Sequence, residues 1–209
     1  MQGELVFIDF ETTGLSAGYD RVIEVAAALV RDGEVAGTFV HLMHPGHRLP
    51  GFITQLTGIT DAMLKDKPRP EAVMPELRGF IGDRACVAHN ASFDSSFYHA
   101  EMSRAGAAHD RAFLCTMKLS RRLVEGSPDH KLGTLIRHLR LPKPKEGNCH
   151  RALYDVLLTV ELWKHLEGVV SERLGGKEPG HEVYHALMKK PKAAVPKYLD
   201  KLAGEMQSS

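Results

Sequence analysis

The sequence lacks a hydrophobic run that could cross a membrane, which would take about 18–20 apolar residues. It also lacks a basic N-terminal segment of signal-peptide type, because acids interrupt the first apolar stretch, "MQGELVFIDFE". Cysteine is scarce: Cys86, Cys115 and Cys149 are odd in number and form no CxxC pair. We therefore expect free thiols in a reducing compartment, a cytoplasmic location and no membrane partner.

An excess of charge of one sign is also missing from the chain as a whole. The 27 basic and 26 acidic side chains leave a net charge of +1, so the protein is not a polycation. The segment 116–151 is an exception, with nine Lys or Arg against three Asp or Glu. This basic segment fits a local anion-binding surface or, equally, a solvated helix face.

The 209 residues, 43% of them hydrophobic, are enough for one folded domain with a core. A strand is predicted to end near Phe10, and strands over 22–30 and 35–43 flank Asp32-Gly33, which is typical of a hairpin. Short strands then alternate with helices. The predicted strands cover 85–89 and 112–116, and the predicted helices cover 71–82, 91–106, 117–124, 131–141 and 150–168. This order predicts an α/β fold with a mixed sheet flanked by helices.

The character of the sequence changes after Gly168. The stretches "GGKEPG" and "KKPKAAVPK" are linker-like, and two short helices are predicted over 181–190 and 197–206. We therefore expect one domain over residues 1–168 and a linker-like C-terminal appendage over 169–209.

Two acids interrupt the first predicted strand. Asp9 and Glu11 are two residues apart, so their side chains point to the same face of a strand. Buried carboxylates need a partner, and a hard divalent cation such as Mg²⁺ prefers oxygen ligands. Asp94 and Asp155 follow at the beginnings of predicted helices. Taken alone, Asp94 fits a first-turn acid favoured by the helix dipole, and Asp155 fits a solvated helix residue.

Three motifs stand in a fixed order: "DFETTGL", "HNASFD" and "HRALYD". Together they resemble the motifs of the DEDDh 3′→5′ exonucleases, which include the epsilon proofreading subunit of bacterial DNA polymerase III and exonuclease X. The resemblance runs from about Leu5 to Leu166. It implies an RNase H-like fold with a mixed five-stranded sheet, and a two-metal 3′→5′ exonuclease site.

The resemblance also implies the roles of five residues. Asp9, Glu11, Asp94 and Asp155 would hold two divalent cations, Mg²⁺ or Mn²⁺, and His150 would be the general base. Residues five apart on a helix are about 140° out of register. His150 is therefore predicted to lie on a loop or in the very first turn, with Asp155 inside the helix.

Contacts to the substrate are implied at five further positions. They comprise main-chain groups beside the terminal sugar, an apolar wedge, a loop amide and an aromatic ring: Thr12, Thr13, Leu15, Asn90 and Phe93. The spacing of the aromatic ring from Phe97 also fits packing in a core.

The resemblance leaves several functions open. The expected substrate is a single-stranded or frayed 3′ end, with DNA favoured over RNA, in proofreading beside a polymerase subunit or in free-standing DNA repair. The alternatives are an RNA-trimming exoribonuclease, a metal-dependent endonuclease, and a non-catalytic module that binds nucleic acid or a polymerase.

Overall fold

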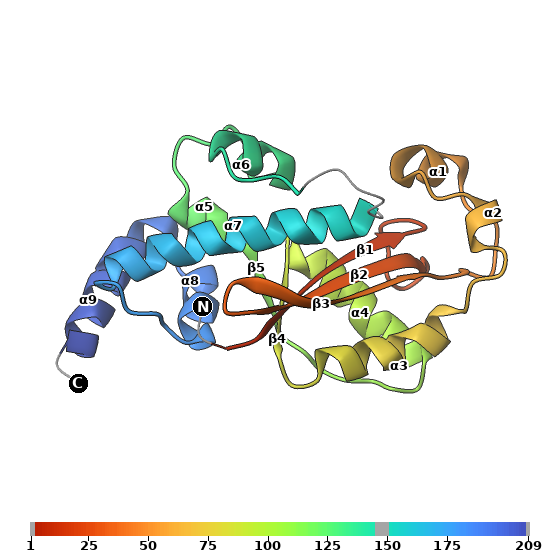
Figure 1. Cartoon of the computed structure of the whole chain (residues 1–209), viewed down its shortest axis with the longest axis horizontal. Helices are drawn as coiled ribbons and strands as arrows, with labels where there is room; N and C mark the ends of the chain where they lie inside the picture. The colour runs from red at the N-terminus through yellow and green to blue at the C-terminus, as the bar shows by residue number, and fades with distance from the viewer. Residues whose placement is uncertain (1–2, 145–150, 208–209) are drawn as a thin grey trace.

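The computed structural model describes residues 3–144 and 151–207 (Figure 1). Its strands are β1 (Leu5–Thr12), β2 (Val22–Arg31), β3 (Glu34–Leu42), β4 (Ala85–Ala88) and β5 (Phe113–Cys115). Its helices are α1 (Gly51–Thr57), α2 (Asp61–Leu64), α3 (Pro70–Ile81), α4 (Ala91–Arg104), α5 (Thr116–Leu123), α6 (Leu132–His138), α7 (Arg151–Arg173), α8 (His181–Lys189), the 3₁₀ turn η1 (Lys192–Ala194) and α9 (Val195–Gln207).

The five strands form one mixed sheet in the order β3-β2-β1-β4-β5. The first three are antiparallel neighbours, whereas β4 pairs in parallel with β1 and β5 with β4. The hairpin between β2 and β3 turns at Asp32 and Gly33, whose φ angles of 52° and 80° are both positive. The predicted mixed sheet, with the meander on one side, is confirmed.

The strand β1 divides its side chains between two cores. Leu5 and Phe7 belong to a cluster with α7, whereas Val6, Ile8 and Phe10 belong to a cluster with α3 and α4. This alternation follows from the two-residue repeat of a strand. The positions after Phe7 on the α7 face are occupied by Asp9 and Glu11.

Helix α7 crosses the face of the sheet formed by β1 and β2 (Figure 1). Small side chains at Ala26 and Ala28 line that face of β2, which gives the helix room to approach. At 23 residues α7 is the longest helix. Even so, no helix in the described part of the chain is long and apolar enough to span a membrane.

Proline inside a predicted helix proved compatible with that helix. Helix α3 begins at Pro70 and continues through Pro75 to Ile81. A proline at the sixth helical position forgoes one hydrogen bond, to the carbonyl four residues earlier, which lies in the first turn. The helix is nevertheless continuous from Pro70 to Ile81 and buries Val73, Met74, Leu77 and Ile81.

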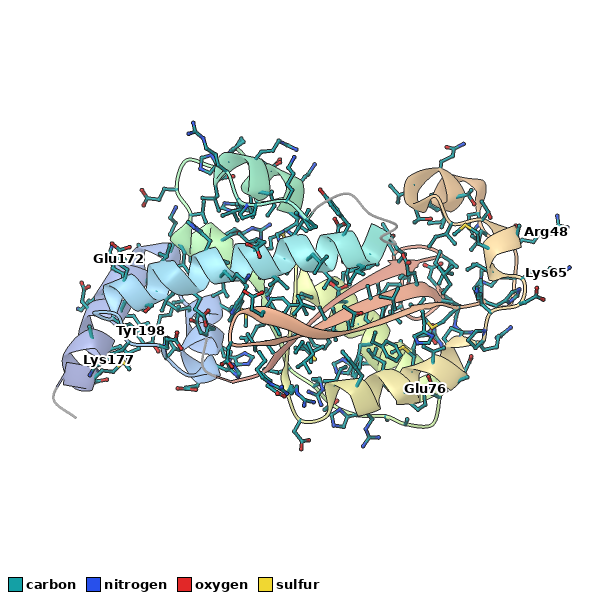
Figure 2. All side chains as sticks on the ribbon, in the orientation of Figure 1. Arg48, Lys65, Glu76, Glu172, Lys177 and Tyr198 are labelled. Carbon is teal, nitrogen blue, oxygen red and sulfur yellow. The ribbon has the colours of Figure 1, made fainter. Side chains whose placement is uncertain are left out.

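The residues after 168 pack onto the rest of the protein. The boundary expected there falls inside α7, and Val183, Tyr184 and Leu187 of α8 lie in the same hydrophobic cluster as α7. Figure 2 shows Glu172, Lys177 and Tyr198 at the end of the molecule opposite Arg48 and Lys65. A separate functional role for residues 169–209 stays a prediction.

Two of the three cysteines can be placed. Cys86 and Cys115 are free and buried, as expected for thiols that serve in packing. Burial raises the pKa of the Cys86 thiol to about 12, which keeps it protonated and unreactive. Cys149 lies outside the described residues.

Candidate active site

The first two acids of the site come from the C-terminal half of β1. Asp9 and Glu11 continue the face that Leu5 and Phe7 begin, so they stand on the side of the sheet that α7 covers, and both are partly exposed. Hydrophobic residues earlier in the strand fix this register by packing into the core. The strand thus presents carboxylates on a face that is otherwise apolar.

The third acid comes from the first turn of α4. Asp94 is only 2% exposed, and its Oδ1 has no hydrogen-bond partner within the described residues. β1 pairs with β4 only over Leu5–Phe7. Farther along β1, the N–H of Phe10 donates to the Asp94 carboxylate, which ties this side chain to the end of the strand. The Oδ1 atom of Asp94 is therefore buried without a hydrogen-bond donor in the described part of the chain.

The fourth acid, Asp155, lies in α7 and completes the cluster. Burial raises the pKa of Asp9 well above its ordinary value, and the charges of Asp94, Asp155 and Glu11 raise it further, in that order. Carboxylates affect one another in this way only when they are close. The structure therefore brings together the four acids that the sequence motifs single out.

This carboxylate cluster suits a hard cation. Burial raises the pKa of Asp94 to about 8. Hydrogen bonds from its own backbone N–H and from that of Phe10 act in the opposite direction and lower the pKa, but burial has the larger effect. Oxygen ligands of this kind bind Mg²⁺ or Mn²⁺. The acids in the described ranges do not form a closed ligand group for one ion. Ionised carboxylates at close range repel one another, and a cation held between them would offset that repulsion.

The predicted general base cannot be placed. His150 lies outside the described residues, and α7 begins at the next residue, Arg151. His89, near Asn90, is unsuited to the role, because its Nε2–H donates to the carbonyl of His130 and its Nδ1 bonds the Thr116 hydroxyl. Burial lowers the pKa of His89 to about 4, so it is neutral and serves to hold the loop.

The loop after β1 is held by its own polar groups. Thr12 Oγ1 donates to the carbonyl of Gly14 at 2.6 Å, and Thr13 Oγ1 donates to Asp20 at 3.2 Å. A Cβ at Gly14 would stand 2.5 Å from the Asp20 carboxylate, so a larger residue there would displace Asp20 from its hydrogen bonds to Thr13 and Ser16. Both threonine side chains are buried, whereas Leu15 is 87% exposed at the tip of the loop.

The other two predicted substrate contacts lie where β4 meets α4. Asn90 precedes the helix in a left-handed conformation with φ 64° and makes no side-chain cap. Its side chain is exposed to solvent. Phe93 is half-buried, and its ring centroid lies 4.9 Å from that of Phe97. Part of Phe93 therefore belongs to the core, as the spacing allowed.

Sequence reasoning missed a further acid, Glu24 of β2. It pairs directly with Glu11 across the two strands and is 1% exposed. One signal was available: an acid inside the buried run "VIEVAAALV" needs a partner, as Asp9 does.

It also missed an ion-pair network behind the loop. Glu101 is fully buried and accepts from Arg21 at 2.8 Å, and Arg104 donates to the carbonyls of Ala17 and Gly18. These partners are about 80 residues apart in the sequence, so no local sequence pattern predicts that they form ion pairs or hydrogen bonds.

Comparison with known proteins identifies the family. A family model, RNase_T, described as exonuclease, matches residues 6–163. A DNA polymerase III of PolC type from Halalkalibacterium halodurans is 39% identical over 166 residues, and one from Caldanaerobacter subterraneus is 36% identical over 163. Each match covers 78% of this chain but 11% of the relative, so the chain spans about a ninth of these curated relatives.

Solved structures show the same fold. Exonuclease X in complex with 5′ overhanging duplex DNA is 33% identical, with a TM-score of 0.62 over 78% of this chain and 91% of that one. E. coli exonuclease I in complex with a dT13 oligonucleotide is 20% identical, with a TM-score of 0.69 over 83% and 43% of the two chains. The expected RNase H-like fold is confirmed.

Proposed function

The chain belongs to the RNase_T exonuclease family, in its DEDDh type, and from this premise we propose that it removes nucleotides in the 3′→5′ direction from single-stranded or frayed DNA ends. The observation that carries the proposal is the meeting of four carboxylates from β1, α4 and α7, with one buried oxygen of Asp94 left without a donor.

The charge of this cluster fits the chemistry. Asp9, Glu11, Asp94 and Asp155 supply about four negative charges, which two divalent cations would neutralise. Two such ions, Mg²⁺ or Mn²⁺, stabilise the attacking and leaving oxygens of a phosphodiester displacement. The role of the four acids is to hold the cations at the end of β1, where a strand end can enter.

His150 is the proposed general base. An imidazole with an ordinary pKa of about 6.5 is largely neutral at pH 7–8 and can accept a proton. In the sequence it directly precedes α7, the helix that carries Asp155. Removing a positioned base costs on the order of 10²–10⁴-fold in rate.

The proposed substrate contacts come from the end of β1 and the loop after it, and from the beginning of α4, next in sequence to Asp9, Glu11 and Asp94. Main-chain groups at Thr12 and Thr13 would meet the terminal sugar, and exposed Leu15 would pack against the terminal base. Asn90 and the exposed part of Phe93 would border the same nucleotide from α4. Contacts of this kind discriminate little between base sequences, because they are made to the sugar, the phosphate backbone and the faces of the bases.

DNA is the favoured substrate because one group of similar proteins is named DNA polymerase III and the similar exonuclease X is solved in complex with DNA. The PolC-type relatives also favour a DNA polymerase as partner, in proofreading, beside a free-standing role in repair. An exoribonuclease remains the second candidate.

The test uses 5′-labelled substrates with Mg²⁺ or Mn²⁺: single-stranded DNA, matched and mismatched duplex DNA, and single-stranded RNA. We expect a ladder that shortens from the 3′ end, fastest on single-stranded DNA, and abolished by EDTA or Asp9→Ala. A faster reaction on RNA would favour the exoribonuclease. Cleavage of circular DNA would favour an endonuclease, and no metal-dependent cleavage of any substrate would favour a non-catalytic module.

A further inference from the structure

Glu24 of β2 stands beside the proposed site but on the side away from Asp94. It faces Glu11 directly across the β1–β2 ladder, and directly paired residues share one face of a sheet. β2 and β4 flank β1 on opposite sides, and α4, which carries Asp94, follows β4. Glu24 is therefore placed between the sheet and α7, where it is 1% exposed.

The carboxylate of Glu24 reaches the first turn of α7. Its Oε2 accepts a hydrogen bond of 3.4 Å from the backbone N–H of Ala152, the second residue of the helix. The first N–H groups of a helix have no partner within the helix, so an outside acceptor is needed. A negative charge at this end is further favoured by the helix dipole.

The helix so held is the one that carries an acid of the site. Asp155 lies one turn beyond Ala152, whereas Asp9 and Glu11 lie on the sheet. The distance between the two sets of carboxylates depends on how the beginning of α7 is fixed to the sheet. The Ala152 amide is buried with its residue, so water cannot replace the carboxylate there at little cost.

We propose that Glu24 is a positioning residue, which fastens the first turn of α7 to β2 through the Ala152 amide and thereby sets Asp155 against Asp9 and Glu11. This inference rests on the proposed function and adds a residue to it. Glu24 acts on the metal site through α7 and is not itself a ligand. Consistent with this, its charge has the smallest effect of the four neighbouring carboxylates on the pKa of Asp9.

The test compares Glu24→Gln, which keeps an acceptor oxygen, with Glu24→Ala, which removes it. Glu161→Ala on the same helix is the control, because Glu161 pairs with Lys164 at the surface. Circular dichroism and thermal melting establish that each variant is folded. Hydrogen exchange at the Ala152 amide, Mn²⁺ binding by calorimetry and exonuclease kinetics are then measured.

For Glu24→Ala we expect exchange at Ala152 to rise by about 10-fold or more. Mn²⁺ affinity and kcat should fall by roughly 10- to 100-fold with little change in KM, as for residues that orient a ligand. Glu24→Gln should recover Mn²⁺ affinity and kcat to within about 5-fold of the wild type, and Glu161→Ala should match the wild type.

Two results would overturn the proposal. If Glu24→Gln binds Mn²⁺ as weakly as Glu24→Ala while Ala152 stays protected, the charge matters and Glu24 is a ligand. If Glu24→Ala leaves exchange at Ala152 unchanged, the contact does not hold the helix. A wild-type protein that degrades no substrate would refute the proposed function alone, since the exchange measurement still decides the role of Glu24.

Discussion

The indole of Trp163 and the phenol ring of Tyr184 lie 4.7 Å apart between centroids, at an interplanar angle of 50°, and join α8 to α7. Both side chains are among the largest fully buried ones in the described part of the protein. The contact shows that the segment after the exonuclease motifs contributes to the core.

Truncation of Tyr184 should therefore destabilise the whole protein. We expect Tyr184→Ala to lower the free energy of unfolding by about 3–5 kcal/mol, as for other buried aromatic rings. Tyr184→Phe is the matched control: the hydroxyl has no partner within the described residues, so its removal should change stability by no more than about 1 kcal/mol. Urea denaturation measures both, and an unchanged midpoint for Tyr184→Ala would contradict the packing of α8.

The metal-free protein should lose stability as the pH rises. Burial raises the pKa of Asp94 from its ordinary 3.8 to about 8, so the folded state binds this proton more tightly than the unfolded state. The stabilisation is complete below the unfolded pKa and is lost as the pH passes through the folded one. Melting in EDTA between about pH 5 and 9 should show a falling Tm.

Two comparisons isolate the role of Asp94 in that pH dependence. Asp94→Asn should flatten it and raise the Tm of the metal-free protein at pH 8 by roughly 4–8 °C, which corresponds to about 2 kcal/mol. Mg²⁺ should raise the Tm of the wild type but not that of the variant. A Tm that is independent of pH in the metal-free wild type would show that burial does not raise the pKa of Asp94 in this way.

Arg104 should control how well the loop presents Leu15. Its guanidinium donates to the carbonyls of Ala17, Gly18 and Asp20, which fixes the loop from the far end of α4. We expect Arg104→Ala to reduce kcat/KM on single-stranded DNA by about 10-fold, as for a residue that orients a contact. Leu15→Ala should have a similar effect. If Leu15→Ala lowers kcat/KM but Arg104→Ala does not, the loop keeps its shape without Arg104 and the prediction is wrong.

The basic segment 116–151 can now be tested at selected positions. Arg121 and Lys131 are exposed, whereas Arg122 donates to the carbonyls of Lys190 and Lys118 and contributes to the packing of the chain. We expect Arg121→Glu with Lys131→Glu to raise KM and to weaken its dependence on salt, because fewer phosphate contacts remain.

Lys197→Glu is the control for this pair, since Lys197 is an exposed lysine of α9, which lies away from the C-terminal end of β1 (Figure 1). Initial rates at several salt concentrations give the comparison. Equal salt slopes for the wild type and the double variant would show that the segment is only a solvated face.

Local signals predicted much of the architecture. Asp32-Gly33 identified the hairpin, and Asp9 with Glu11 identified the face of β1 that carries the acids. These predictions succeeded because turn conformation and strand alternation depend on neighbouring residues.

The parts that sequence reasoning missed depend on distant contacts. Glu24 looks like an interruption of a hydrophobic run until the β1–β2 register pairs it with Glu11 and α7 covers it. In the same way, the composition "KKPKAAVPK" favours a linker, although Val195 within this stretch is buried. Composition cannot show which surface a short amphipathic helix will cover.

Because successive side chains of β1 enter two different cores, the face on which Asp9 and Glu11 lie depends on the number of residues before them in the strand. Deleting one residue before Asp9 would turn the carboxylates toward α3 and α4 and would bring Ile8 and Phe10 under α7. Deleting two would preserve the faces. The irregularity just after the Glu11–Glu24 pair marks where this constraint ends, since the odd residue is absorbed there. Changes of length in this strand should therefore be tolerated in twos and not in ones.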